Sequence, residues 1–179
     1  MQVKELSDPF AGAPAGAPGR PYGTLRVFLG LLALSFFIRL PFFFDIVIDW
    51  DESTYILFGQ SLLDGHLPYT ELCGFKPPLT HVFYACAIAL FGKSIVSVRI
   101  AGALCVAGAA FLTYLTGRAL WNHRAGVLAA TLCVFIATFL RSAQCTMTEH
   151  AAIVPLAGAL ALLARGRPAR RTLFLAGIL

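Results

Sequence analysis

Two short polar motifs gather the side chains of this chain that could do chemistry. The first is Asp49-Trp50-Asp51-Glu52 and the second is Lys76-Pro77-Pro78-Leu79. Carboxylates can act as general bases or bind polar groups, and a lysine ammonium can bind an anion. The first motif also belongs to an unusual concentration of acids, because six of the nine acidic residues fall between Asp45 and Glu71. Such clustering in an otherwise apolar chain indicates a site for chemistry or binding.

The composition is that of a membrane protein. Of the 179 residues, 58% are hydrophobic and 13% are charged, and the mean hydropathy is +0.76. A soluble domain of this size needs much more polar surface, whereas apolar runs of about 18 residues or more are typical of membrane spans. The formal net charge of +5 comes from basic residues beside apolar runs, as topology signals do. No basic face with interleaved polar contacts is visible, which excludes nucleic-acid binding.

The apolar runs predict an all-α, polytopic membrane helix bundle of about four to five transmembrane helices. We expect four of them near 27–46, 95–117, 124–142 and 150–164, and a fifth that starts near Thr172. The run 77–92 begins with two prolines and is shorter than a span, so we expect it to lie in the interface or to re-enter.

Lysine and arginine set the expected orientation. They precede the first helix and crowd two later loops, whereas residues 45–74 contain none. The positive-inside rule then puts the N-terminus in the cytoplasm and the acidic segment outside. Glu149 falls in the next outside loop, and is the sole acid between Leu72 and Leu179. The basic residues expected inside are Lys4, Arg20, Arg26, Arg118, Arg124, Arg165, Arg167, Arg170 and Arg171.

The first outer loop has its own predicted helix, from about Glu52 to Asp64. Asp51 can cap it, and Gly65 can end it. Its apolar residues at helical spacing favour an amphipathic helix on the membrane surface. A cap is the simpler interpretation of Asp51, but it does not explain the paired acids after a span. The apolar residues of this helix are Tyr55, Phe58 and Leu62.

The motifs resemble a known family in their order along the chain. The sequence is similar, from about residue 24 onward, to the start of glycosyltransferase family 39, within the C-type membrane glycosyltransferase superfamily. That family contains the dolichyl-phosphate-mannose protein mannosyltransferases and the lipid A aminoarabinose transferases. The segments that carry the resemblance are Asp51-Glu52-Ser53-Thr54-Tyr55, Gly65-His66-Leu67-Pro68-Tyr69, Lys76-Pro77-Pro78-Leu79, Phe91-Gly92 with Arg99, and Thr148-Glu149-His150.

The resemblance implies transfer of a sugar from a polyprenyl-phosphate donor to an acceptor hydroxyl on the extracytoplasmic face. It makes Asp51 the general base, with Glu52 orienting the acceptor or holding the pocket. Lys76 is the first candidate for the donor phosphate, followed by Arg39 and Arg99. Arg39 has a simpler interpretation, because an arginine near a helix end can snorkel to the interface.

The resemblance also implies the surroundings of the site. Asp49, Tyr55, Glu149 and His150 are expected to line the pocket, and the acceptor is a lipid, a glycan or a protein. No cofactor is required. A metal is not expected, because Phe75 stands where some family members carry an acid. The histidines expected outside also match no standard zinc spacing. These histidines are His66, His81 and His150.

The sequence predicts two parts of the chain and leaves alternative functions open. Residues 1–25 are rich in Ala, Gly and Pro and read as a disordered cytoplasmic tail, and residues 26–179 as the N-terminal part of a transferase membrane domain. Family members are much longer, so a fragment or an inactive truncated product is one alternative. A non-catalytic lipid-binding or assembly protein is another. A transporter would instead carry ionisable residues at the bilayer midplane. We expect a multi-pass protein of the cell (inner) membrane.

Overall fold

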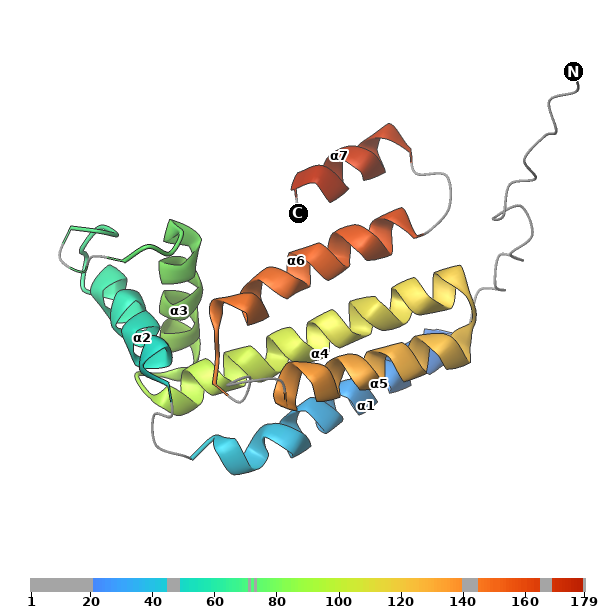
Figure 1. Cartoon of the computed structure of the whole chain (residues 1–179), viewed down its shortest axis with the longest axis horizontal. Coiled ribbons are helices and arrows are strands. Elements are labelled where there is room, and N and C mark those ends of the chain that lie inside the picture. The colour runs from blue at the N-terminus through green and yellow to red at the C-terminus, as the bar shows by residue number, and fades with distance from the viewer. Residues whose placement is uncertain are drawn as a thin grey trace, which may run out of the picture.

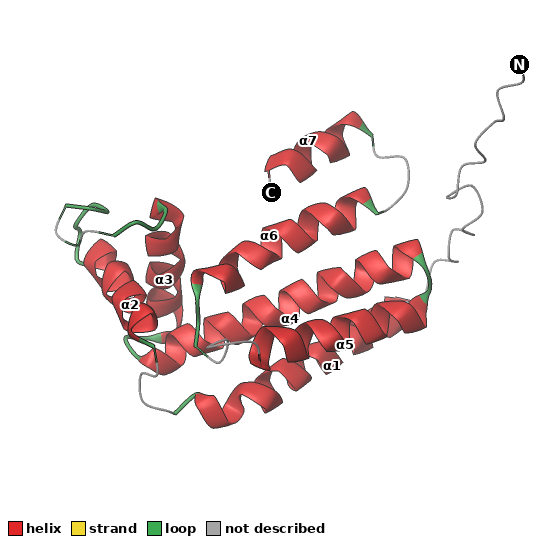
Figure 2. Cartoon of the chain, in the orientation of Figure 1, coloured by secondary structure: helices red, strands yellow, loops and turns green. Residues whose placement is uncertain are grey.

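A computed structural model describes residues 21–44, 49–70, 72, 74–139, 145–164 and 169–178. Within these residues the secondary structure is helical and no strand occurs (Figure 2). The all-α prediction is therefore confirmed. The helices in chain order are α1 (Pro21–Arg39), η1 (Leu40–Phe42), α2 (Trp50–Leu63), α3 (Pro78–Phe91), α4 (Ile95–Leu120), α5 (His123–Phe139), α6 (Thr148–Leu163) and α7 (Arg170–Ile178).

Two of the described helical segments are long and apolar enough to cross a membrane. They are Gly23–Phe42, formed by α1 and η1, and Ile95–Leu120, which is α4. Helices α3, α5 and α6 are apolar but have only 14, 17 and 16 residues. By length and composition, two of the expected four to five spans are therefore present among the described residues.

Helices α1, α4 and α5 run side by side, and α6 lies along another side of α4 with α7 packed on it (Figure 1). Small residues allow α4 and α5 to approach closely. A Cβ atom added at Gly117 would lie 2.9 Å from the Cα of Gly126, so neither position accepts a larger residue without movement. The buried residues shared by α1, α4 and α5 are Leu31, Val106, Ala110, Tyr114, Ala130 and Val134.

Helices α2 and α3 form a hairpin at the end of α4 where that helix begins (Figure 1). Gly59 permits the contact, since a Cβ atom there would lie 2.8 Å from the backbone nitrogen of Ala85. Tyr55 and Phe58 are buried in the cluster that α2 forms with α3 and α4. That α2 lies on the membrane surface stays a prediction, whereas the side of α2 that carries Tyr55 and Phe58 packs on protein. The reason is that α3 offers an apolar partner of matching length.

Helix ends follow local chemistry. The α-helical part of α1 ends at Arg39 because Pro41 lacks a backbone N–H and disfavours helical geometry before it. It begins at Pro21, earlier than predicted. Helix α2 ends as predicted at Gly65, which has a φ of 93°. The amide of Gly65 donates to the carbonyl of Leu62 and that of His66 to the carbonyl of Ser61, the two hydrogen bonds of a Schellman motif.

Candidate functional site

The cap of α2 is Asp49. Its Oδ1 accepts a hydrogen bond from the amide of Asp51 at 3.0 Å, and its extended backbone is that of an N-cap residue. The prediction that Asp51 is the cap is therefore wrong by two residues, since the helix already begins at Trp50. Asp51 is exposed in the first turn instead. The partial positive charge of a helix N-terminus favours an ionised carboxylate at this place.

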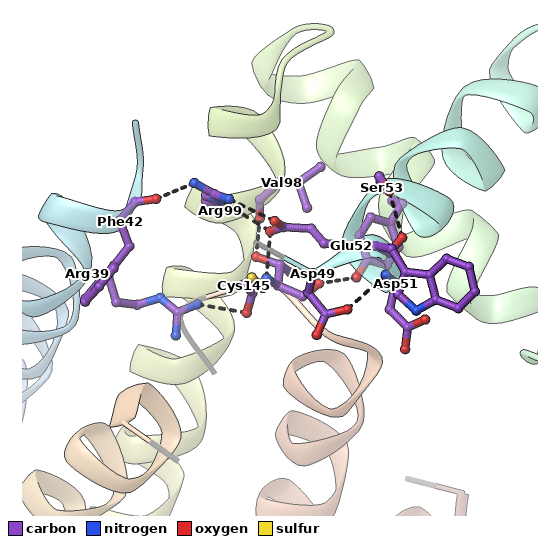
Figure 3. Close-up of polar contacts among 12 residues, drawn as sticks. Arg39, Phe42, Asp49, Asp51, Glu52, Ser53, Val98, Arg99 and Cys145 are labelled. Atoms are coloured by element: carbon purple, nitrogen blue, oxygen red, sulfur yellow. Dashed lines mark hydrogen bonds and ion pairs between the residues drawn. The ribbon is translucent and has the colours of Figure 1, made fainter. Parts of the chain in front are cut away.

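Glu52 points the other way and is fully buried (Figure 3). Its Oε2 lies 2.9 Å from a terminal nitrogen of Arg99 on α4, and its Oε1 accepts from the amide of Thr146 at 2.9 Å. Arg99 also donates to the carbonyl of Phe42. The pair therefore ties together α2, α4, the end of η1 and the segment before α6. Of the two roles expected for Glu52, these contacts fit holding the pocket.

Arg39 is buried as well, so it does not snorkel to an interface. Its guanidinium lies 3.4 Å from the carbonyl oxygen of Cys145, 3.5 Å from that of Ala137 and 3.4 Å from Nε2 of His150. An arginine at the last residue of α1 thus contacts the end of α5 and the start of α6. The snorkelling interpretation failed because packing on α5 and α6 encloses the helix end.

His150 closes the first turn of α6. Its Nδ1 accepts from the amide of Met147 at 3.1 Å, in a capping-box arrangement. That hydrogen bond requires a lone pair on Nδ1, so a neutral ring carries its proton on Nε2, the nitrogen nearest Arg39. His150 is buried, whereas the adjacent Glu149 is exposed. The histidine therefore fixes the helix start from which Glu149 projects.

Asp51, Tyr55 and Lys76 form a second polar group at the surface. The Tyr55 hydroxyl donates to Oδ2 of Asp51 at 3.4 Å, and Nζ of Lys76 lies 5.4 Å from the centre of the Tyr55 ring. A hydrogen bond with the Tyr55 hydroxyl raises the pKa of Lys76 above 10.5, and the carboxylates of Glu149 and Asp51 act in the same direction. Burial raises the pKa of Tyr55. Lys76 therefore carries its positive charge at neutral pH, and its ammonium lies over the ring of Tyr55, which binds Asp51.

Lys76 and Glu149 both line a groove of about 680 Å³ between α3 and α6, here called the α3–α6 groove. The rest of its lining is mostly apolar and includes Val82 of α3 and Ala152 of α6. Lys76 itself is held by its backbone, since its carbonyl accepts from the Tyr69 hydroxyl and Pro77 follows it. The groove thus combines an apolar trough with a cation and a carboxylate.

Apart from Asp49, the cap of α2, the site residues expected from the sequence fall into three groups. Asp51, Tyr55, Lys76 and Glu149 lie around the surface group, whereas Glu52 and Arg99 form the buried pair. Arg39 and His150 form a third, buried contact that the sequence did not predict. In the described part of the chain, no three His, Cys, Asp or Glu side chains come together to hold a metal ion.

Thr146 and Tyr84 belong to the same network, and no sequence motif indicated them. The Tyr84 hydroxyl donates to the Thr146 carbonyl, and the Thr146 hydroxyl donates to the carbonyl of Val98 at 3.0 Å. Thr146 therefore connects Glu52 to α3 and α4. Two of its contacts use the backbone, which any residue type supplies, and its hydroxyl adds the hydrogen bond to Val98. A cue lay in Gly102, where a Cβ atom would lie 2.4 Å from the Thr146 hydroxyl oxygen.

Comparisons with known proteins bear on these residues. A family model described as dolichyl-phosphate-mannose-protein mannosyltransferase matches residues 75–179. No curated protein and no solved structure gave a match. The matched range includes Lys76, Arg99 and Glu149 and begins after Asp51. It spans more than half of the chain and agrees with the two apolar helices of a membrane protein. The chain therefore belongs to the dolichyl-phosphate-mannose-protein mannosyltransferase family, whose members are membrane glycosyltransferases.

Proposed function

We propose that the chain transfers a sugar from a polyprenyl-phosphate donor to an acceptor hydroxyl, with Asp51 as general base. The observation that carries this proposal is the surface group beside the apolar groove. In it, the exposed Asp51 carboxylate and the Lys76 ammonium both contact Tyr55. An apolar trough with a cation at its polar end fits a long hydrocarbon chain that ends in phosphate.

In the proposed reaction, Asp51, Lys76 and Glu149 each have a different role. The Asp51 carboxylate takes the proton of the acceptor hydroxyl, whose oxygen forms a bond to the anomeric carbon. The bond between that carbon and the phosphate oxygen breaks, and its electrons leave with the polyprenyl phosphate. Lys76 stabilises the phosphate as its charge increases. Glu149 lines the same groove and binds sugar or acceptor hydroxyls.

The buried groups position the reacting ones in this proposal. The Glu52–Arg99 pair fixes the first turn of α2 against α4, which sets the place of Asp51. His150 fixes the first turn of α6 through its hydrogen bond with the Met147 amide, which sets the place of Glu149. In this assignment the Arg39 and Arg99 guanidinium groups act on protein contacts, and Lys76 alone of the three serves the donor phosphate.

We further propose that this end of the helices faces the outside of the cell (inner) membrane in a multi-pass protein. The support is the separation of charge. Asp49 and Asp51 begin the hairpin at the start of α4, whereas Arg118 at its end contacts Thr24 near the start of α1, at 3.1 Å. The positive-inside rule then directs Arg118 and the N-terminus to the cytoplasm.

The test is a transfer assay on the chain in lipid vesicles with a panel of polyprenyl-phosphate sugars and hydroxyl acceptors. Asp51→Asn should lower turnover by about 10²- to 10⁴-fold, the usual contribution of a general base. Asp64→Asn is the matched control, because Asp64 is an exposed acid at the other end of α2. Equal turnover in wild type and Asp51→Asn, or none in the wild type, would contradict the proposal and favour a non-catalytic lipid-binding protein.

A further inference from the structure

Tyr69 combines an unusual backbone conformation with a contact to Lys76. Its φ is 70°, and among the residues that the structure describes it is the one non-glycine residue in the left-handed region. A bulky side chain makes this conformation unfavourable, so other contacts must hold it. The side chain is 44% exposed, and burial in a core therefore does not account for the conformation.

Two contacts of its side chain hold Tyr69 in place. The hydroxyl donates to the backbone carbonyl of Lys76, seven residues further along the chain. The ring lies edge-on to that of His81 on α3, with the ring centres 5.5 Å apart. His81 is itself buried, and it stacks on Phe58 of α2 with the ring centres 4.5 Å apart. Tyr69 therefore connects Lys76 to the place where α2 meets α3.

The backbone on each side of Lys76 has little freedom. A Cβ atom at Gly74 would lie 2.4 Å from the ζ carbon of the Phe58 ring, so glycine fits there and a larger residue does not without movement. Pro77 has a φ of −58°, which its ring fixes, and a proline also restricts the residue before it. The hydrogen bond from Tyr69 adds a contact to the Lys76 carbonyl itself.

The backbone of Lys76 decides where its ammonium can lie. A lysine side chain is a flexible four-carbon stem, so a displaced backbone would give the ammonium many other positions. In the structure Nζ lies 5.4 Å from the centre of the Tyr55 ring, and Lys76 lines the α3–α6 groove. The Tyr69 hydroxyl contacts the carbonyl oxygen of Lys76. Its influence on the ammonium therefore passes through the Lys76 backbone.

We propose that Tyr69 is a positioning residue for the donor phosphate, because its hydroxyl holds the Lys76 backbone where the ammonium can reach the α3–α6 groove. This inference rests on the proposed function, in which Lys76 binds the phosphate, and it adds a residue that takes no part in the reaction itself. The hydrogen bond to Lys76 then offsets the unfavourable backbone conformation of Tyr69.

The test compares two ligands that bind the full chain in lipid nanodiscs. One is citronellyl phosphate with a fluorescent group on its hydrocarbon end, and the other is the matching citronellol, which lacks the phosphate. Tyr69→Phe removes only the hydroxyl, and it should weaken phosphate binding by about three- to tenfold, the usual loss for one hydrogen bond. Citronellol binding should not change. The pH at which phosphate binding falls should also stay the same, because the hydroxyl contacts the carbonyl and not Nζ.

Two further variants serve as matched controls. Lys76→Met keeps a long unbranched side chain and should remove the preference for the phosphate over citronellol. Adding Tyr69→Phe to Lys76→Met should then have no further effect on binding, since the hydroxyl acts through Lys76. Tyr114→Phe also removes one hydroxyl, but from a tyrosine that contacts Arg118 at the opposite end of α4, and should leave the binding of both ligands unchanged.

The inference is overturned if Tyr69→Phe weakens both ligands equally, as a purely structural role would, or if it weakens phosphate binding as much in Lys76→Met as in the wild type. A phosphate preference that survives Lys76→Met would contradict the phosphate role of Lys76, and with it the proposed function. A preference that is lost in Lys76→Met and unchanged in Tyr69→Phe would remove the role of Tyr69 alone. These readouts measure binding and need no turnover.

Discussion

At the scale of single residues, the neighbouring acids Asp51 and Glu52 have opposite environments. Successive residues of a helix are turned by about 100°, so the side chain of Glu52 enters the protein when that of Asp51 faces out. Glu52 is then paired with Arg99 and with the amide of Thr146. The two acids are adjacent in the motif, but in the folded chain Asp51 is exposed and Glu52 is a buried partner of Arg99.

We predict that removal of one partner of the buried pair is costly. Glu52→Gln should lower the free energy of unfolding by about 3 kcal/mol, because it leaves the Arg99 charge buried without its counterion. Chemical unfolding in detergent micelles measures this change. The control Asp51→Asn should stay within about 0.5 kcal/mol, since Asp51 is exposed. Restored stability in Glu52→Leu with Arg99→Met would support the pairing, whereas equal effects of Glu52→Gln and Asp51→Asn would contradict it.

Lys76 predicts a pH dependence. The pKa of Lys76 in the folded chain is raised above 10.5, chiefly by the hydrogen bond with Tyr55. The contact between the Lys76 ammonium and Tyr55 is therefore fully present below pH 10.5, and it is lost as the pH rises through the folded pKa. Citronellyl phosphate binding should therefore be constant from about pH 6.5 to about pH 9 and fall only above the ordinary lysine value.

Tyr55→Phe is the control for this pH dependence, because it keeps the ring under Lys76 and removes the hydroxyl. The fall in binding should then begin at a lower pH, which titration of probe fluorescence can follow. A fall that starts near neutrality in the wild type would mean that another group controls binding.

At the scale of elements, close helix contacts at glycine hold in place the helix ends that form the proposed site. The Gly59 contact sets the α2–α3 hairpin, and the contact of Gly117 with Gly126 sets α4 against α5. Such contacts are possible because glycine has no side chain between the two backbones. They let the backbones approach and align the ends of helices that carry Asp51, Lys76 and Glu149.

A matched pair in α4 tests the close contact. Gly117→Ala should lower the free energy of unfolding by about 1 to 3 kcal/mol, because its Cβ atom would meet the Gly126 backbone. Gly108→Ala should raise it by up to about 1 kcal/mol, because its Cβ atom has nothing within 4 Å and alanine favours a helix. Thermal unfolding of the two variants in one detergent compares them, and a shared sign would contradict the close contact.

At the scale of the whole molecule, the proposed site lies at one end of the helices. The hairpin, the ends of α1 and α5 and the starts of α4 and α6 meet there, through contacts of Arg39, Glu52 and Arg99 (Figure 3). Asn122, between α4 and α5, lies at the opposite end and accepts from the amide of Ala125 at 2.9 Å. This separation makes the proposed orientation measurable.

We predict opposite labelling of the two ends in cells. In a chain with its native cysteines replaced, Thr70→Cys should react with a membrane-impermeant maleimide in intact cells. Asn122→Cys should react only after permeabilisation, because positive charge near this turn directs it inside. Both positions are exposed, so accessibility within the protein is matched. Reaction of both in intact cells, or the reverse pattern, would overturn the orientation.

The sequence by itself determined the helical class, the apolar segments and the end of α2 at Gly65. These properties depend on local composition, on periodicity and on the freedom of glycine at positive φ. The cap of α2 was two residues in error, since Asp49 and Asp51 are equally good caps by type. The tail at 1–20 and the acidic segment at 45–48 lie outside the described residues.

The tertiary structure decided which charged residues face each other. Arg39 and Glu52 lie 13 positions apart, yet Arg39 contacts His150 and Glu52 pairs with Arg99. No local pattern specifies such partners, because they depend on how α1, α4 and α6 pack at their ends. The same packing leaves Asp51 exposed and places Lys76 and Glu149 at the α3–α6 groove. The residue types thus come from the sequence, and their division into buried contacts and exposed side chains, which carry the proposed reaction, comes from helix packing.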